Sequence, residues 1–122
     1  PADATASAHN PSCGDLVTLT LRLSSDLQLL ETVCCSTRGC VLCTASADLM
    51  AEVVSGRTPA QALGLGKGFV SLLKGEPSEA AADPALAALR PLAGLPARAR
   101  CALLPWQALA EALELDSENT QL

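Results

Sequence analysis

Three of the six cysteines in this sequence stand where one kind of predicted structure gives way to another. Cys13 precedes a strand-like segment, Cys40 precedes a helix-like segment, and Cys101 opens the last predicted helix. The partial positive charge of a helix N-terminus favours the thiolate form of cysteine. Boundary positions can also bring residues that are distant in the sequence together at one point, so these three thiols could share a task.

Thiolates and one carboxylate could together bind zinc. A structural zinc site usually has four N, S or O ligands in a tetrahedron, and Asp15 can join the three boundary cysteines as the fourth. Cys13 and Asp15 are two positions apart, so on an extended segment their side chains face the same side. Gly14 between them adds no bulk. Because a carboxylate is a harder ligand than a thiolate, such a site could open a position for chemistry.

The other thiols and the single histidine have plainer interpretations. Cys34 and Cys35 lie in a predicted strand, where small thiols behave as hydrophobic residues. Cys40 and Cys43 form one CxxC pair, which no second pair completes into a zinc ribbon. A thioredoxin-like redox pair would need a preceding βαβ pattern, which the sequence lacks. His9 is not expected to be a ligand because it stands in an irregular lead-in.

Charge and hydropathy exclude several classes of protein. The net charge is −5, and no basic run interleaved with aromatic residues is present, so nucleic-acid binding is not expected. The apolar stretches are far shorter than the roughly 20 residues of a membrane-spanning helix, and no secretory signal is visible. We therefore expect a cytoplasmic protein without membrane partners. A reducing cytosol favours metal binding or sulfur chemistry over the secreted disulfide framework that an even number of cysteines would otherwise allow.

Strands come first in the predicted order of elements. Residues 16–23 alternate apolar and polar side chains, which is typical of a half-buried strand. A second strand is predicted at 27–35 and a short third at 38–42, and tight links between them indicate an antiparallel meander. Apolar residues recur at helical spacing from Thr44 onward. The prediction is an α+β fold, with a small three-stranded antiparallel sheet and helices packed on one face.

Start and stop signals divide the rest of the chain into helices. Gly56 ends the first helix, and Thr58–Pro59 and Asp83–Pro84 each read as a cap followed by proline. Arg98 and Arg100 could be solvated charges on the last helix or could stabilise the thiolate of Cys101. We predict one domain over 1–122, with 1–9 as an irregular lead-in and 116–122 as a polar tail. The helices are expected at 44–55, at 59–74 with interruptions at Gly64, Gly66 and Gly68, at 85–90, and at 98–115 with a kink or restart at Pro105.

The motifs, in this order, resemble the NifU/IscU family of iron–sulfur cluster assembly proteins. The Cys-Gly-Asp and Ala-Ser-Ala motifs together make the resemblance specific. A long interval between Cys40 and Cys101, and Arg100 where the IscU branch has histidine, favour the SufU branch. The matching motifs are Asn10-Pro11-x-Cys13-Gly14-Asp15, Gly39-Cys40 followed by Ala45-Ser46-Ala47-Asp48-Leu49-Met50, and Arg98-x-Arg100-Cys101 followed by Trp106.

The resemblance implies a SufE/NifU-like fold and a zinc-dependent, sulfurtransferase-like acceptor of persulfide sulfur from a SufS-type cysteine desulfurase. It implies Cys13, Asp15, Cys40 and Cys101 as the zinc ligands, with Cys13 also as the catalytic sulfur acceptor. The alternative is a scaffold that assembles and transfers a [2Fe–2S] cluster on the same residues, in contact with other cluster-assembly proteins. Cysteine ligation suits both zinc and a cluster.

This sequence departs from the family pattern in three places. The sequence before Asn10 shows no pattern of the helix that usually precedes this motif, so we expect the usual N-terminal helix to be absent. Cys43 replaces a usual serine and brings a fourth thiol near the site, where it could compete for metal or protect Cys13 as a disulfide. Thr37 and Cys35 replace a usual glycine and an aromatic residue, so the turn between the second and third strands is expected to differ.

Overall fold

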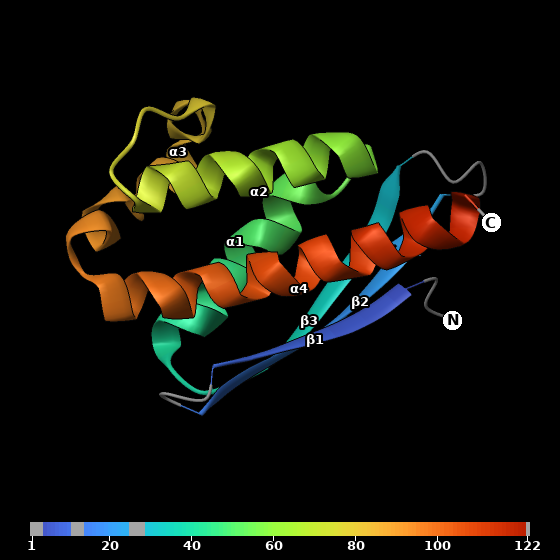
Figure 1. Cartoon of the computed structure of the whole chain (residues 1–122), viewed down its shortest axis with the longest axis horizontal. Coiled ribbons are helices and arrows are strands. Elements are labelled where there is room, and N and C mark those ends of the chain that lie inside the picture. Colours follow the sequence, from blue (N-terminus) through green and yellow to red (C-terminus); the bar gives the residue numbers. More distant parts are fainter. Residues whose placement is uncertain (1–3, 11–13, 25–28, 122) are drawn as a thin grey trace.

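The computed structural model describes residues 4–10, 14–24 and 29–121, and it describes side chains over 14–24 and 29–113. Strands come first and helices follow, in the α+β order that the sequence predicts (Figure 1). The sheet has the order β1-β2-β3, and both strand pairs are antiparallel. The strands are β1 (Ala4–Asn10), β2 (Asp15–Leu23) and β3 (Leu30–Arg38).

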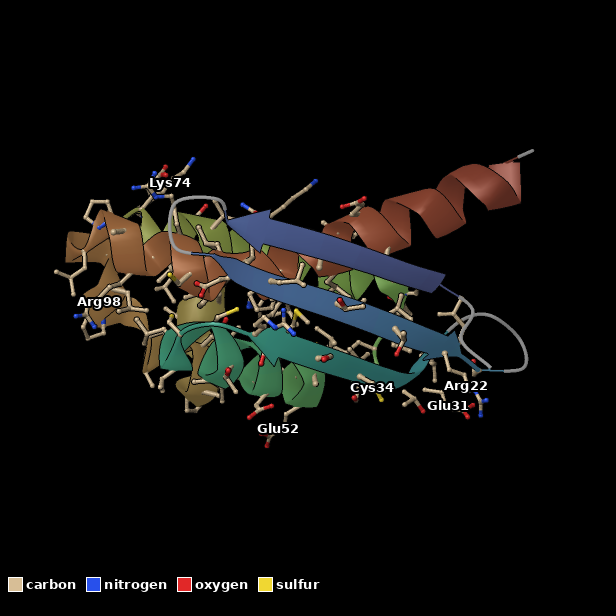
Figure 2. The ribbon with its side chains drawn as sticks, turned by 90° about the horizontal axis from the view of Figure 1, so that it is seen from below. Arg22, Glu31, Cys34, Glu52, Lys74 and Arg98 are labelled. Atoms are coloured by element: carbon tan, nitrogen blue, oxygen red, sulfur yellow. The ribbon has the colours of Figure 1, made fainter. Side chains whose placement is uncertain are left out.

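The central strand, β2, shows which face of the sheet is covered. Val17, Leu19 and Leu21 are buried, whereas Thr18 and Thr20 between them are partly exposed. The predicted alternation is therefore confirmed. Seen from below, the open face of the sheet lies in front and the helices lie behind it (Figure 2).

Two of the three predicted strands are present, and the third is not. The prediction of a strand at 38–42 is wrong, because Gly39 turns the chain with a φ of 134° and a helix begins at Val41. The remaining place in the sheet belongs to β1, so the prediction of an irregular lead-in at 1–9 is wrong for residues 4–9, and residues 1–3 lie outside the described residues. The residues of β1 alternate only between alanine and polar side chains, which is a weak strand signal because alanine favours strands little. The segment is a strand because it pairs along β2, a tertiary contact that local propensity does not report.

Two helices form the layer that covers the sheet. The last helix, α4, packs on β1 and β2, the first helix, α1, packs on β3, and the two helices contact each other. The α2 helix lies against α4 on the side away from the sheet (Figure 1). The helical elements are α1 (Val41–Val54), α2 (Pro59–Leu73), η1 (Glu79–Ala82), α3 (Pro84–Ala87), η2 (Arg90–Gly94) and α4 (Pro96–Gln121).

The start of α2 agrees with the prediction, but its interior does not. Thr58 and Gln61 form a capping box at its N-terminus. The predicted interruptions at its glycines are wrong, because the helix is continuous. One of these glycines has a packing reason instead: a Cβ at Gly68 would lie 3.2 Å from the Ser78 hydroxyl, whereas one at Gly66 would make an ordinary contact with the Trp106 ring at 3.5 Å.

The last helix is longer than predicted at both ends. It begins at Pro96 and continues through Gln121, so most of the segment predicted as a polar tail is helical. Pro105 lies inside it without ending it. Among the described residues, no helix combines the length and the apolar character that crossing a bilayer would need.

Leucine, valine and alanine side chains make up most of the core, as the low aromatic content requires. Its one aromatic contact joins α2 to α4, where the rings of Phe69 and Trp106 have centroids 5.1 Å apart. Both rings are buried. The core therefore extends from the sheet, through the layer of α1 and α4, to α2.

Candidate metal centre

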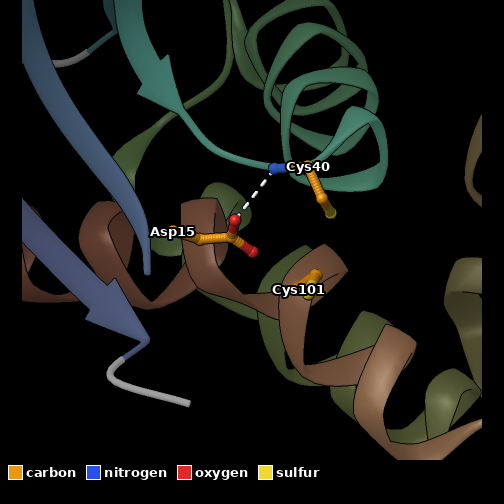
Figure 3. Close-up of side chains that lie close together, drawn as sticks. All are labelled: Asp15, Cys40 and Cys101. Atoms are coloured by element: carbon orange, nitrogen blue, oxygen red, sulfur yellow. Dashed lines mark hydrogen bonds between the residues drawn. The ribbon is translucent and has the colours of Figure 1, made fainter. Parts of the chain in front are cut away.

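The start of β2, the N-terminus of α1 and the first turns of α4 meet at one point (Figure 3). Asp15 is the first residue of β2, Cys40 is the N-cap of α1, and Cys101 lies in α4. One carboxylate oxygen and the two Sγ atoms all lie within 4.8 Å of one another. Asp15 and Cys101 are buried and Cys40 is half-buried. The fold thus brings together three of the residues predicted as metal ligands.

Cys13, the fourth predicted ligand, lies outside the described residues. Its roles as ligand and as sulfur acceptor stay predictions. Gly14, which joins it to Asp15, has a φ of 76°, a backbone conformation that glycine adopts without strain.

Asp15 also fixes the start of α1. Its Oδ1 accepts a hydrogen bond from the backbone N–H of Cys40 at 2.8 Å (Figure 3). Cys40 makes no side-chain cap bond of its own, so β2 supplies an acceptor that the helix N-terminus needs. The positive end of the helix dipole favours a carboxylate there. A carboxylate has two oxygens with several acceptor positions, so this bond is compatible with a second task as a metal ligand.

Gly39 makes that hydrogen bond sterically feasible. Its φ of 134° is accessible to glycine and strained for other residues. A Cβ at this position would overlap with Oδ1 of Asp15 and would lie 2.7 Å from its Cγ. The sequence points to Gly39 only through the family resemblance, because no local pattern reveals that Asp15 fills the space beside it.

A second hydrogen bond ties the helix that follows Cys40 to the helix that carries Cys101. Ser46 on α1 is fully buried, and its hydroxyl donates to the carbonyl oxygen of Ala102 at 2.5 Å. Ala102 is the residue after Cys101. The sequence shows the Ala-Ser-Ala motif but gives Ser46 no role. Its position four residues before the apolar Met50, on the face of the predicted helix that turns inward, is the sequence signal that could have identified it.

The remaining cysteines lie apart from the three converging ligand atoms. Cys43 is fully buried in the core, and the ligand group does not include it. Its proposed competition for metal stays a prediction. Cys34 and Cys35 lie on β3, exposed and partly buried respectively. Burial raises the pKa of the Cys35 thiol to about 11, and the negative charges of Asp48 and Cys34 act in the same direction.

No disulfide joins any two of the five cysteines that the structure describes, which gives no support to a disulfide framework among them. His9 lies in β1 rather than in an irregular segment, and its side chain is not among those described.

The ligand atoms, two thiol sulfurs and one carboxylate oxygen, suit a metal ion of intermediate hardness such as zinc. With metal–sulfur distances of about 2.3 Å, the ligand atoms of a tetrahedral zinc site lie roughly 4 Å from one another. The three atoms at this site already lie within 4.8 Å, so small side-chain rotations would bring them to ligand distances. Two thiols and a carboxylate also suit iron. The geometry therefore supports a metal site without selecting the metal.

Comparisons with known proteins point to one family. Residues 1–88 match the model of the NifU-like N terminal domain. The chain is 34% identical over 116 residues to the iron–sulfur cluster assembly scaffold protein IscU of Streptococcus pyogenes serotype M1, over 93% of this chain and 70% of that protein. It is 33% identical over 102 residues to the zinc-dependent sulfurtransferase SufU of Bacillus subtilis, over 83% of this chain and 68% of that protein.

Solved structures agree with this. The crystal structure of a putative iron–sulfur cluster assembly scaffold protein for the SUF system from Fervidobacterium islandicum AW-1 superposes with a TM-score of 0.85 at 29% identity. The alignment covers 92% of this chain and 81% of that one.

Proposed function

We propose that this chain, which belongs to the NifU/IscU family of iron–sulfur cluster assembly proteins and is of the SufU type, accepts sulfur from a cysteine desulfurase at a zinc site. The observation that carries the proposal is the convergence of Asp15, Cys40 and Cys101 from three separate elements. The proposed zinc ligands are these three residues and Cys13.

A bound divalent cation would keep its thiol ligands deprotonated at neutral pH. Three thiolates and one carboxylate carry more negative charge than one zinc ion neutralises, so the site as a whole is anionic. The chain's own contribution is to hold two of these ligands firmly. Asp15 holds the backbone of Cys40, and Ser46 holds α4 directly after Cys101.

Cys13 is the proposed sulfur acceptor because the glycine that joins it to β2 allows a change of backbone conformation at little cost. Gly14, its neighbour, is free of Cβ strain, and a side chain there would meet no atom within 4 Å. In the transfer step, the Cys13 thiolate attacks the outer sulfur of the desulfurase persulfide. A new S–S bond forms on Cys13, the S–S bond of the donor breaks, and the donor cysteine leaves as a thiolate.

A persulfide-mapping experiment tests this function. The protein is incubated with a SufS-type desulfurase and cysteine, alkylated, and analysed by mass spectrometry. We expect a persulfide on Cys13 and its loss in a Cys13→Ser variant. A persulfide confined to Cys101 would contradict the assignment, and one on Cys43 would make this extra thiol the acceptor.

A cluster scaffold is the second candidate, and it is supported by the chain's similarity to a protein named as a scaffold and by a donor set that also suits iron. In that function the [2Fe–2S] cluster is cargo. Metal analysis of protein purified without oxygen separates the two candidates. The sulfur acceptor should contain about one zinc per chain, whereas a scaffold should contain iron and acid-labile sulfide. Either metal should be lost in a Cys101→Ala variant.

A further inference from the structure

Two threonine hydroxyls lie on either side of the turn that carries Cys40. Thr37 is near the end of β3, and Thr44 is the fourth residue of α1. Their Oγ1 atoms are 2.9 Å apart, which is a hydrogen-bond distance for two hydroxyl groups. Gly39 and Cys40 lie in the segment between them. The bond therefore joins the strand before the turn to the helix after it.

A second contact of Thr44 gives the direction of this bond. The Thr44 hydroxyl lies 3.5 Å from the carbonyl oxygen of Cys40, and the backbone N–H of Thr44 donates to the same oxygen at 3.3 Å. A threonine hydroxyl has one proton to donate, and a carbonyl oxygen can only accept. The proton of Thr44 therefore belongs to the bond with Cys40, and Thr37 is the donor to Thr44. We call these two bonds, from Thr37 to Thr44 and from Thr44 to Cys40, the hydroxyl relay.

Both peptide groups that flank the Cα of Cys40 are tied by hydrogen bonds. Asp15 in β2 accepts the bond from the N–H of Cys40 at 2.8 Å, and the relay from β3 ends on its carbonyl oxygen. The backbone has only two soft torsions at each residue. Because both neighbouring peptide groups are held, the φ of −78° and ψ of 158° at Cys40 are held as well, and with them the direction of its side chain.

We propose that Thr37 and Thr44 are positioning residues for Cys40, and that their hydroxyl relay slows the release of metal from the candidate site. This inference rests on the proposed function and adds to it the residues that keep one ligand in place while Cys13 moves. Both threonines act through the backbone of Cys40, because a hydroxyl group that holds a carbonyl oxygen fixes the ligand without binding the metal.

The expected effect is moderate, because the bond between the two hydroxyls is exposed to solvent. Water can replace either partner of an exposed bond, so its net contribution is smaller than that of a buried one. We expect the loss of the relay to accelerate metal release about threefold, and we expect the metal itself to stay bound at equilibrium.

Amide hydrogen exchange at Cys40, measured by NMR on the full chain as purified, tests the relay without an activity assay. Thr37→Val keeps the branched shape and removes the hydroxyl, so exchange of the Cys40 N–H should accelerate about threefold. Thr37→Ser keeps the hydroxyl and should restore the wild-type rate. Thr32→Val makes the same change at an exposed position of β3 and should leave the rate at Cys40 unchanged.

Transfer of zinc to excess chelator from the zinc-loaded chain provides the second measurement. Thr37→Val should shorten its half-time about threefold, and Thr37→Ser should not. If the two threonines form one relay, the double variant T37V/T44V should be no faster than Thr44→Val alone. Thermal unfolding of each variant establishes that the fold is intact.

The outcomes that contradict the relay differ from those that contradict the function. Wild-type exchange and zinc half-times in Thr37→Val, or equal acceleration in Thr37→Val and Thr32→Val, would overturn the relay and leave the proposed function standing. Faster exchange at Cys40 with an unchanged zinc half-time would also overturn it, because the turn would then not limit metal release. A wild-type chain that retains no zinc and accepts no sulfur would overturn the proposed function, and this inference with it.

Discussion

The two glycines that bracket α1 share a backbone requirement and differ in their surroundings. Gly39 before the helix has a φ of 134°, and Gly56 after it has a φ of 82°. A Cβ at Gly56 would meet no atom within 4 Å, whereas a Cβ at Gly39 would overlap with Asp15. The turn after α1 therefore needs glycine for its backbone alone. The turn before α1 also needs it because a candidate metal ligand occupies the adjacent space.

Two serines repeat this contrast. Ser46 and Ser78 each donate a hydroxyl hydrogen bond at 2.5 Å to a carbonyl oxygen of a neighbouring helix. Ser46 binds Ala102, next to Cys101, whereas Ser78 binds Gly68 in the contact between η1 and α2. Ser78 also accepts a hydrogen bond from the N–H of Ala80, but the donated bond is alike in the two serines, and only that of Ser46 lies beside the ligands. Equivalent substitutions at the two ends of the fold should therefore separate effects on the site from effects on stability.

Gly39→Ala should have the largest effect. The added methyl group must displace the Asp15 carboxylate, and the residue must keep a strained φ, so we expect a loss of about 3 kcal/mol or more in unfolding free energy. Metal binding should be lost with it. Gly56→Ala carries only the backbone strain, about 1–2 kcal/mol, and should keep its metal. Urea unfolding and metal analysis measure both. Equal losses would mean that Asp15 moves aside freely.

The two roles of Asp15, as the acceptor for the N–H of Cys40 and as a candidate metal ligand, can be separated by comparing two variants. Asp15→Asn keeps an oxygen acceptor for the N–H of Cys40 but removes the anionic ligand, so it should retain most of the stability and bind metal more weakly. Asp15→Ala removes the acceptor as well, which should cost a further 1–3 kcal/mol or so because the N–H loses its partner. Competition with a chromophoric chelator measures metal affinity. Wild-type affinity in Asp15→Asn would make the carboxylate a turn residue.

Some elements of the fold were predictable from the sequence and others were not, for physical reasons. The period of β2 and the capping signals of α2 are local, so both were predictable from neighbouring residues. The pairing of β1, the continuity of α2 through its glycines and the true start of α1 depend on contacts between distant segments. Pattern reasoning has no access to these, and it therefore missed β1, placed a strand where α1 begins and interrupted α2 at its glycines.

The candidate site shows the same division. Residue types and boundary positions were enough to choose Asp15, Cys40 and Cys101. The hydrogen bonds that hold them were not visible, because Asp15 and Cys40 are 25 positions apart and Ser46 and Ala102 are 56 positions apart. Residue types therefore indicate which ligands are available, whereas contacts between distant segments determine where these ligands are held.

The serine pair should show a smaller effect than either preceding pair. Ser46→Ala removes one hydroxyl donor to a helix carbonyl, and Ser78→Ala removes one such donor together with the acceptor of the Ala80 N–H, so each should cost about 1–3 kcal/mol in unfolding free energy. Only Ser46→Ala should accelerate metal loss, because it loosens α4 beside Cys101. The half-time of metal transfer to excess chelator measures this difference. Equal half-times in the two variants would mean that the bond stabilises the fold without positioning the ligand.

Thiol reactivity should show the smallest effect and extend the comparison to β3. Cys34 is exposed and should alkylate first, whereas Cys35 should react slowly near pH 8 because its pKa is raised from 9.0 to about 11. The folded state keeps this proton longer than the unfolded chain does. The resulting small stabilisation is therefore full below pH 9 and is lost as the pH rises toward 11.

Metal removal separates these thiols from the ligands. Stripping zinc should leave the alkylation rates of Cys34 and Cys35 unchanged and should accelerate those of Cys40 and Cys101, because a metal-bound thiolate is shielded from the reagent. Mass spectrometry after timed alkylation measures each site within one sample, so Cys34 serves as the internal control. Acceleration at all four positions would mean that metal removal loosens the whole fold, and the distinction between the ligand end and the rest of the molecule would fail.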